Sequence, residues 1–314
     1  MSKEKIEKLV IIGSGPAGLT AGIYSARAEL NPLILDGDKP GGQLMGTSDV
    51  ENWPGEKSIL GPTLMLNIRE HAKHFGCRFL SESASNVDVS QRPFTVTTDK
   101  GTQIKTHSII LATGATPRKL GCPGEDKYWS KGVTSCAVCD AAFYKDKKVV
   151  VIGGGDSAME NASFLQKFSK DVTVIHIGDK LTASVVMQKR VLDNPNITVI
   201  YNSTVTAFKG DEQHLQEIEV TNQQTKEKTI MKADGAFISI GLKPNTDFVR
   251  GKIDLTDYGY VMIKGHKDHT KTSVDGIFAA GDIADPFYKQ AITSSAAGCM
   301  AALDVERYLA SILD

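Results

Sequence analysis

Short apolar runs rich in β-branched residues recur along the chain, and each is followed by a glycine-rich turn and a helical stretch. The first run covers residues 9–12 and precedes a helical stretch over 19–29 and a second apolar run over 32–35. The same succession recurs from 149 to 175, with its helical stretch over 159–168. Strand, helix and strand in this order form half of a dinucleotide-binding fold. The pattern therefore predicts an α/β protein with two such units.

Both turns have the spacing G-x-G-x-x-G/A. The first turn is Gly13, Ser14, Gly15, Pro16, Ala17 and Gly18, and the second is Gly153, Gly154, Gly155, Asp156, Ser157 and Ala158. The first glycine lets the chain turn off the strand, the second lets the backbone approach a pyrophosphate, and the third position must be small for packing. The helix N-terminus offers N–H groups to the phosphates. One copy alone is explained by a tight turn, but two copies in this context predict two dinucleotides, or one divided between domains.

The residue that ends the second strand differs between the two units. Asp36 lies there in the first unit, and a carboxylate at this position accepts hydrogen bonds from an adenosine ribose. His176 occupies the equivalent position in the second unit. The second unit therefore lacks the acidic ribose partner that the first one has.

Further strands are expected at 109–111, 236–240 and 276–280, and each ends in a tight turn. The first turn contains Ala112, Thr113 and Gly114, and the third contains Gly281 and Asp282. The second turn contains Gly241, which Ile240 precedes. A helix is expected from Gln290 onward, and its small residues over 294–298 suit either a planar cofactor or plain helix packing. The order of elements predicts two Rossmann-like, three-layer nucleotide-binding domains. One comprises residues 1–117 and 245–314, and the other, 118–244, is inserted into it.

Composition narrows the class of protein. The chain has 314 residues, 41% hydrophobic and 23% charged, which is enough for two globular cores. Its net charge of -1, from 36 basic and 37 acidic residues, argues against capture of nucleic acid or of a membrane surface. The charged N-terminus lacks a signal-peptide core, and no apolar run is long enough to span a bilayer. We expect a cytoplasmic protein.

The five cysteines include one closely spaced pair, Cys136 and Cys139. Cys77, Cys122 and Cys299 stand alone, and we expect each to be a small buried apolar residue. A C-x-x-C pair is typical of half a zinc site or of a redox pair. A zinc site needs two further Cys or His ligands, and the sequence has no second pair, so we expect no metal.

In this order, the motifs resemble those of low-molecular-weight thioredoxin reductase, from about residue 8 to residue 313. Besides the two glycine turns, they comprise Gly41-Gly42-Gln43-Leu44, Val50-Glu51-Asn52-Trp53-Pro54-Gly55, Ala112-Thr113-Gly114-Ala115, Cys136-Ala137-Val138-Cys139-Asp140, Ala280-Gly281-Asp282, Gln290-Ala291-Ile292-Thr293-Ser294 and the segment 298–304. No one of these motifs fixes the family, whereas the ordered set points to it.

The resemblance implies FAD in the discontinuous domain. It implies that Ser14 to Ala17 bind the pyrophosphate, that Asp36 binds the ribose and that Val87 lies near the adenine. It places Gln43 and Asn52 beside the isoalloxazine, with Gly42 and Leu44 next to them. Asp282 is implied at the ribityl or phosphate region, beside Lys289, Gln290 and Ala291; the family usually has Arg at position 289. A homodimer is also typical of the family.

For the cysteine pair, the resemblance implies that FAD passes two electrons to the Cys136/Cys139 dithiol, which then reduces a thioredoxin-like protein disulfide. Cys139 is implied as the flavin-proximal sulfur and Cys136 as the one that attacks the substrate. We expect Asp140 to protonate the thiolate, while a helix N-cap is its structural alternative. The family usually has Gly where this chain has Ala141. The inserted domain is expected to rotate about connections near Pro117 and Pro244.

The electron donor is less clear, because typical members carry His-Arg-Arg-Asp-x-x-Arg after the second strand of the inserted domain. Those arginines bind the 2′-phosphate of NADPH. The three positions are Ile177, Gly178 and Thr182 here, with Lys180 between them. Three donors stay open: NADH, NADPH bound weakly, or a ferredoxin or another flavin donor. We expect no strong NADPH preference.

Two other classes of function stay open. One is a flavoprotein oxidoreductase with a non-disulfide acceptor, and the cysteine pair argues against it. The other is a non-catalytic redox sensor that binds nucleotide. Two complete nucleotide turns around a C-x-x-C pair favour turnover over sensing.

Overall fold

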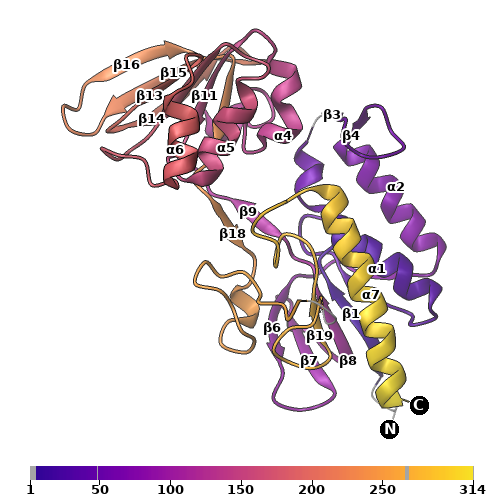
Figure 1. Cartoon of the computed structure of the whole chain (residues 1–314). Helices are drawn as coiled ribbons and strands as arrows, with labels where there is room; N and C mark the ends of the chain where they lie inside the picture. Colours follow the sequence, from indigo (N-terminus) through magenta and orange to yellow (C-terminus); the bar gives the residue numbers. More distant parts are fainter. Residues whose placement is uncertain (1–4, 48, 266–268, 314) are drawn as a thin grey trace. The chain divides into compact units, whose positions relative to one another are not determined.

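The chain folds as two compact units in the computed structural model, which describes residues 5–47, 49–265 and 269–313 (Figure 1). Unit 1 comprises Met1–Thr116 and Lys243–Asp314, and unit 2 is Pro117–Leu242. These bounds lie one and two residues before the domain limits expected from the sequence. Short strands β9 (Ala115–Pro117) and β18 (Leu242–Pro244) pair where the chain passes between the units.

Unit 1 is built on a seven-stranded sheet in the order β5-β2-β1-β8-β7-β6, with β19 also paired to β8. Its parallel strands are β5 (Arg78–Leu80), β2 (Leu33–Leu35), β1 (Ile6–Ile12), β8 (Gln103–Leu111) and β19 (Ile277–Ala279). β6 (Ala84–Asp88) and β7 (Phe94–Thr98) continue it as an antiparallel meander. The first half of β8 pairs with β7 and its second half with β19, so one strand serves both layers.

Alternation along β1 separates the two cores of unit 1. Leu9 and Ile11 pack with helices α1 (Pro16–Arg27), α2 (Gly61–His74) and α7 (Ala291–Leu313). Val10 and Ile12 face the meander layer, which includes Val87, Phe94 and Val96. Because successive strand side chains point to opposite faces, the second half of this central strand, residues 9–12, is continuously apolar and buried on both faces. Unit 1 is therefore a three-layer structure.

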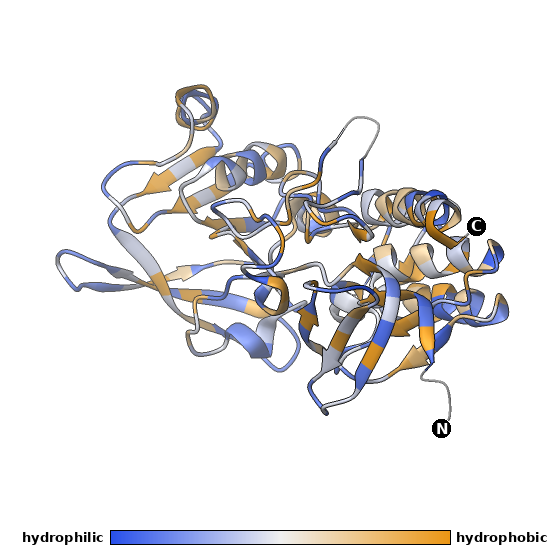
Figure 2. Ribbon diagram, turned by 90° about the horizontal axis from the view of Figure 1, so that it is seen from below, coloured by the Kyte–Doolittle hydropathy of each residue, from blue (hydrophilic) through white to orange (hydrophobic). Residues whose placement is uncertain are grey.

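Unit 2 repeats the arrangement with a five-stranded parallel sheet in the order β10-β17-β11-β12-β13. The strands are β10 (Val133–Thr134), β17 (Gly235–Ile238), β11 (Lys148–Ile152), β12 (Asp171–Ile175) and β13 (Ile197–Ile200). One face packs on α4 (Ala137–Asp140), α5 (Asp156–Leu165) and α6 (Val185–Leu192), and the other on the meander β14 (Ser203–Gly210), β15 (Leu215–Asn222) and β16 (Lys228–Lys232). Orange along the central strands of Figure 2 marks these apolar cores. The expected α/β, three-layer fold class is confirmed.

Shorter elements complete the chain. They are η1 (Gly42–Gly46), β3 (Asp49–Val50), β4 (Ile59–Leu60), α3 (Glu125–Tyr128), η2 (Ala141–Tyr144) and η3 (Asp247–Val249). Among the described residues, no helix has both the length and the apolar character that a membrane crossing needs.

The two nucleotide-motif helices begin earlier than the apolar pattern predicts. α1 starts at Pro16 rather than 19, and α5 starts at Asp156 rather than 159. Each starts directly after the second motif glycine, and these first turns carry no apolar periodicity from which a helix could be read. α1 also ends before the predicted residue 29, since Glu29 has a φ of 59° and cannot continue a right-handed helix.

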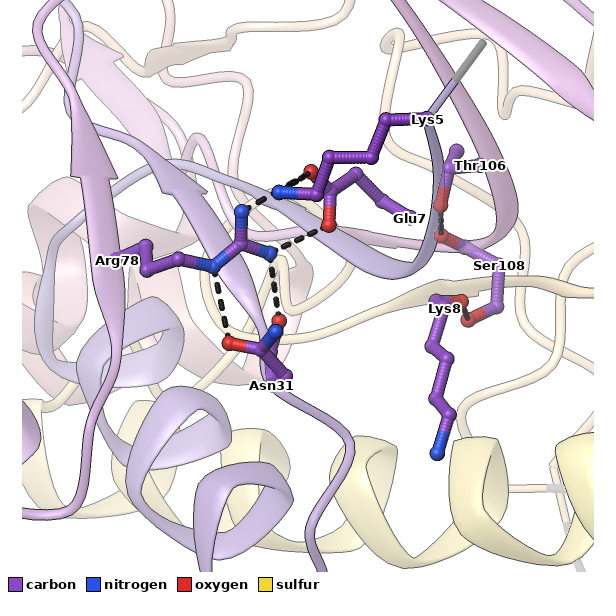
Figure 3. Close-up of polar contacts among 7 residues, drawn as sticks. All are labelled: Lys5, Glu7, Lys8, Asn31, Arg78, Thr106 and Ser108. Carbon is purple, nitrogen blue, oxygen red and sulfur yellow. Dashed lines mark hydrogen bonds and ion pairs between the residues drawn. The ribbon is translucent and has the colours of Figure 1, made fainter. Parts of the chain in front are cut away.

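A polar cluster joins the N-terminal strand of unit 1 to the edge strand β5 (Figure 3). Arg78 donates hydrogen bonds to both carboxylate oxygens of Glu7, at 3.0 and 2.5 Å, and to the backbone and side chain of Asn31. Lys5 forms a further ion pair with Glu7 at 2.9 Å. The Arg78 guanidinium, and to a smaller extent Lys5, hold the pKa of Glu7 below its usual range despite burial. The cluster thus bridges β1 and β5 across the start of β2.

Candidate functional site

The glycine turn of unit 1 leaves open space above its second glycine. Gly13 has a φ of +111°, and a Cβ there would lie 2.3 Å from the Ala112 carbonyl oxygen, so only glycine fits. A Cβ at Gly15 would meet nothing within 4 Å. Gly15 is the N-cap of α1, and no side chain caps this helix. The turn therefore has the open backbone that a pyrophosphate requires.

Ser14 holds a second loop beside this turn. Its hydroxyl accepts a hydrogen bond from the Gly41 N–H at 3.2 Å. A Cβ at the neighbouring Gly42 would come within 3.3 Å of the Gly15 backbone, so the two loops run close together. Gly42 opens the 3-10 turn η1, which also contains Gln43 and Leu44. The structure thus brings the first and second predicted FAD segments together.

Asp36 lies at the end of β2, as predicted, and has a partner that the sequence analysis missed. Arg69 of α2 donates a 2.7 Å hydrogen bond to its Oδ2, and the Arg69 guanidinium stacks on the Phe79 ring at 4.0 Å. The Asp36 side chain is fully buried, yet Oδ1 has no hydrogen-bond partner, nor does Nη1 of Arg69. Buried polar atoms without partners are rare, and a ribose hydroxyl is a fitting one.

Gln43 and Asp282 meet although 239 positions separate them. Gln43 Nε2 donates to the Ala115 carbonyl at 2.7 Å and to Asp282 Oδ2 at 3.4 Å. Ser294 of α7 donates to the other Asp282 oxygen at 2.9 Å. Burial raises the pKa of Asp282, and the Ser294 hydrogen bond opposes this. A half-buried acid with amide and hydroxyl partners is suited to binding the hydroxyl groups of a cofactor.

Asn52 and Gln290 also come together, with Asn52 Nδ2 donating to Gln290 Oε1 at 3.3 Å. Gln290 precedes α7, whose first residue is Ala291. Lys289 adopts a left-handed φ of 52° just before it, and its N–H donates to Asp285. These residues, predicted from separate motifs, all lie at one end of α7.

The turn after β8 is held by a residue that the sequence analysis missed. Asn245 Nδ2 donates to the Thr113 carbonyl at 2.8 Å, and the Asn245 N–H donates to the Gly114 carbonyl at 3.0 Å. The Thr113 hydroxyl donates back to the Asn245 carbonyl at 2.7 Å. Its place directly after the Pro-containing strand β18 was the available signal. Val87, by contrast, lies on β6 with its side chain fully buried in the core, so only its backbone is available to a ligand.

Glycines on and before α7 allow close contact with α1. A Cβ at Gly298 would lie 2.1 Å from the Ala17 carbonyl of α1, and a Cβ at Gly281 would lie 3.0 Å from Ala17 Cβ. Close packing of α7 on α1 therefore accounts for Gly298, one of the small residues over 294–298.

The glycine turn of unit 2 has the same open second position. A Cβ at Gly155 would have Thr182 Oγ1, at 3.8 Å, as its nearest neighbour, and no side chain caps α5. Asp156 turns away to α6, where its Oδ1 accepts hydrogen bonds from the N–H and hydroxyl of Ser184 at 2.9 and 2.8 Å. Ser157 is exposed, Ala158 is buried, and Ile240 packs at the edge of the meander core before Gly241.

His176 forms part of the loop wall rather than an exposed ribose ligand. Its ring is buried against Gly154, and its Nε2 lies 2.9 Å from the Lys180 carbonyl, to which it donates. The N–H groups of Thr182 and Ala183 donate to the Gly154 carbonyl. The loop is therefore fixed to the glycine turn. Of the positions where the family carries arginine, Ile177 is 61% exposed and Thr182 is exposed.

Cys136 and Cys139 are joined by a disulfide with a Cα–Cα distance of 5.3 Å. They follow β10, and Cys136 is the N-cap of α4, where its Sγ accepts a hydrogen bond from the Cys139 N–H at 3.2 Å. An N–H aimed at sulfur favours the thiolate over the thiol once the disulfide is reduced. Val138 and Phe143 are exposed beside the pair.

The carboxyl group of Asp140 is bound by Thr134. Asp140 is the last residue of α4 and occupies the N-cap position of η2, but its side chain makes no capping hydrogen bond, so the expected N-cap contact is wrong. Its Oδ2 accepts a 2.5 Å hydrogen bond from the Thr134 hydroxyl. Burial raises the pKa of Asp140, and the Thr134 hydrogen bond lowers it. The raised value brings this carboxyl closer to neutral pH, where an acid can both give and take a proton.

The remaining cysteines differ from one another. Cys77 is buried as expected, and burial raises its pKa to about 11. Cys122 and Cys299 are only half-buried, which corrects the expectation for both. Burial raises the pKa of Cys122, also to about 11, so it is a poor nucleophile at neutral pH. The described residues include no group of His, Cys, Asp and Glu suited to a metal ion.

The model of one known family, pyridine nucleotide-disulphide oxidoreductase, matches residues 7–298. The chain belongs to this family. Among its curated relatives, a thioredoxin reductase of Chlamydia pneumoniae is 46% identical over 310 residues, covering 96% of this chain and 98% of that one. A thioredoxin reductase of Dictyostelium discoideum is 45% identical and covers 99% of this chain and all of that one.

Solved structures of the family agree with the sequence comparison. A thioredoxin reductase from Giardia duodenalis has a TM-score of 0.92 at 41% identity, covering 96% of this chain and 98% of that one. One from Streptococcus pyogenes MGAS5005 has a TM-score of 0.92 at 36% identity, covering 99% and 100%. The resemblance to thioredoxin reductases found from the motifs is confirmed. As a member of this pyridine nucleotide-disulphide oxidoreductase family, the chain is an oxidoreductase. Its similarity to the family supports a flavin and a pyridine nucleotide as cofactors.

Proposed function

We propose that the chain is a thioredoxin-disulfide reductase in which FAD binds unit 1 and the Cys136/Cys139 pair of unit 2 reduces a thioredoxin-like protein. The observation that carries this proposal is the Cys136–Cys139 disulfide, set beside the carboxyl group of Asp140 in a unit that also has an open dinucleotide turn. The relatives bear the name of this activity at 42–46% identity.

The residues of unit 1 fit FAD. The turn at Gly15 would accept the pyrophosphate, and the unpartnered oxygen of Asp36 would accept a ribose hydroxyl. Gln43, Asn52 and Asp282 would bind the flavin half. When bound, the flavin supplies two electrons to the cysteine pair. The further proposed contacts are Gly42, Leu44, Val87, Ala112, Thr113, Gly114, Gly281, Lys289, Gln290 and Ala291.

The exchange with substrate follows from thiolate chemistry. The Cys136 thiolate attacks the substrate disulfide, forming a mixed disulfide and releasing one substrate thiolate. Cys139 then attacks Cys136 within the mixed disulfide, which restores the enzyme disulfide and releases the second substrate thiolate. Two electrons pass from the enzyme pair to the substrate. The Cys139 N–H on Cys136 Sγ supports Cys136 as the attacking group.

Asp140 handles one proton in this cycle. Its acid form gives a proton to the first substrate thiolate, and its carboxylate then takes the Cys139 proton, so that Cys139 can attack. The second substrate thiolate takes its proton from solvent, which balances the reaction. A carboxyl group whose pKa burial has raised is suited to both steps.

NADH is the proposed electron donor. Weak use of NADPH, or electron transfer from a ferredoxin-type donor, would replace this proposal. Gly155 and the uncapped start of α5 support a dinucleotide in unit 2. The exposed Ile177 and Thr182 offer no charge to a 2′-phosphate. The proposed contacts are Gly153, Gly154, Gly155, Asp156, Ser157, Ala158, His176, Ile240 and Gly241.

We further propose a homodimer and a cytoplasmic location. Large apolar side chains are exposed on the helical layer of unit 1, among them Tyr24, Leu66, Met300 and Leu303. Burying them against a second copy would remove this area from water. A cysteine pair that cycles through the dithiol suits a reducing compartment.

Anaerobic mixing of the flavin-loaded protein with NADH, NADPH or reduced ferredoxin tests the donor. Bleaching of the flavin absorbance by NADH at lower concentration than by NADPH is the expected result. Subsequent addition of oxidised thioredoxin should restore the absorbance. If no disulfide restores the absorbance but quinones or oxygen do, the acceptor is not a disulfide and the proposal is wrong. If no donor bleaches the flavin, a redox sensor is favoured.

A further inference from the structure

We propose that Thr134 is a positioning residue for proton transfer, because its hydroxyl fixes the Asp140 carboxyl relative to the start of the cysteine motif. The inference rests on the proposed role of Asp140 as the proton carrier. Nothing in the motif spacing singles out Thr134, which lies two residues before Cys136.

The two contacts of the Thr134 hydroxyl determine where its proton lies. The Cys136 N–H donates to Thr134 Oγ1 at 3.2 Å, and Oγ1 lies 2.5 Å from Asp140 Oδ2. A hydroxyl has one proton to donate, and the Cys136 N–H already uses an acceptor position. The hydroxyl proton therefore points to Asp140 Oδ2. The carboxyl group must take up and give its own proton at Oδ1, the oxygen that Thr134 does not occupy.

The framework around Thr134 holds the hydroxyl in place. Thr134 is the last residue of β10 and pairs with Phe237 of β17 in parallel register. Its β-branched side chain has few χ1 choices. The Cys136 N–H then ties the same hydroxyl to the backbone of the redox motif. One side chain thus couples the sheet, the acid and the first cysteine.

Among the groups around Asp140, the Thr134 hydroxyl has a distinct effect on the pKa of its carboxyl group. Burial disfavours the carboxylate, and the Thr134 hydrogen bond is the contact that favours it. From η2, Tyr144 faces the same region, and its pKa is raised to about 12 by burial and by the charges of Asp140 and Asp234. Tyr144 therefore stays neutral over the working range, and Cys136 and Cys139 are the other titrating groups once reduced.

The test compares Thr134→Val, which keeps the side-chain shape and removes the donor, with Thr134→Ser, which keeps the donor. The measurement is the pH dependence of the rate at which the pre-reduced, flavin-loaded enzyme reduces thioredoxin in a single turnover. In wild type, the rate falls at high pH as Asp140 loses its proton. Without the Thr134 donor, this limb should move up by about one pH unit, and the rate at low pH should drop about tenfold as the acid loses its fixed position.

Thr134→Ser should restore most of the wild-type profile. Thr134→Ala serves as a second donor-free variant if Val impairs folding, and near-UV circular dichroism together with flavin content reports folding. An unshifted profile in folded Thr134→Val or Thr134→Ala overturns this inference. Asp140→Asn separates it from the proposed function: if that variant reduces thioredoxin at the wild-type rate, the role of Asp140 itself is wrong.

Discussion

Arg69 donates a 2.7 Å hydrogen bond to Asp36 Oδ2, while the remaining atom of each group, Arg69 Nη1 and Asp36 Oδ1, is buried without a partner. A pair that neutralises its charge but leaves one donor and one acceptor open is suited to a ligand that supplies both, such as an adenosine ribose. The pair therefore has two roles, in the stability of unit 1 and in the binding of the proposed FAD.

Arg69→Met should destabilise the flavin-free protein, because it leaves the fully buried Asp36 carboxylate without its counter-charge. Breaking a buried ion pair from one side costs about 3–5 kcal/mol in the free energy of unfolding. Urea unfolding measures this cost, and fluorescence titration with FAD should show weaker binding. Arg27→Met, at an exposed arginine of α1, is the matched control. Unchanged stability and affinity in Arg69→Met would show that the pair has neither role.

Cys136→Ser and Cys139→Ser should each abolish thioredoxin reduction and leave flavin binding intact, since the cysteines lie in unit 2 and the proposed flavin residues in unit 1. Turnover with oxidised thioredoxin measures the loss, and the flavin absorbance of the purified variants measures cofactor content. Cys122→Ser, at a half-buried cysteine of the same unit, should keep full activity. Full activity in the two pair variants would favour a non-disulfide acceptor.

The strands and their layers could be predicted because buried parallel strands are continuous apolar runs, as residues 9–12 and 149–152 are. The starts of α1 and α5 could not, since their first turns lie against the glycine loops and carry no apolar period. The glycine turns themselves were predictable because the φ of +111° at Gly13 admits little else. Local backbone geometry of this kind can be predicted from the residue types.

Long-range partners were the part of the site that could not be predicted. Arg69 lies 33 positions from Asp36, on a helix whose register against β2 depends on the packing of the whole layer. Asn245 reaches Thr113 across 132 positions. Thr134 is only six residues from Asp140, but the chain must turn through α4 for the two to meet. These contacts cannot be predicted from the spacing of the residues along the sequence.

Glu7→Gln should lower the free energy of unfolding by about 1–3 kcal/mol at pH 7, the range for a hydrogen bond to a charged group. The folded-state pKa of Glu7 is lowered, chiefly by Arg78, so its contribution is present above the unfolded value of 4.5 and is lost as the pH falls through the folded value. Chemical unfolding of wild type and variant should therefore differ at pH 7 and converge in acid. Glu56→Gln, at an exposed glutamate, should show no such convergence. A pH-independent difference would mean that the charge of Glu7 is not what stabilises unit 1.

Ile177→Arg combined with Thr182→Arg should raise kcat/KM for NADPH by at least about tenfold, because each charge-assisted hydrogen bond to the 2′-phosphate contributes about 1.5–3 kcal/mol. Both positions are exposed and can accept a long side chain. Gly178 is left unchanged, since a Cβ there would lie 2.8 Å from Nε2 of the buried His176. The double Gln variant at the same two positions controls for side-chain length. A low-micromolar KM for NADPH in wild type would show that these arginines are not needed.

Asp140→Asn should make unit 2 more stable at neutral pH while it slows thioredoxin reduction. Burial raises the folded-state pKa of Asp140 above its ordinary 3.8, so the folded state binds more protons between the two values and stability falls as the pH rises through that window. Asn keeps an oxygen for the Thr134 hydroxyl but never carries the charge. We therefore expect thermal unfolding to show a gain in Tm, on the order of 2 °C at pH 7, which shrinks toward pH 3.8. Asp179→Asn, at an exposed aspartate of the same unit, should show no gain. A Tm at or below that of wild type at pH 7 would mean that burial of the Asp140 carboxylate does not destabilise the folded state. The pKa of Asp140 would then not be raised, which would contradict its proposed role in proton transfer.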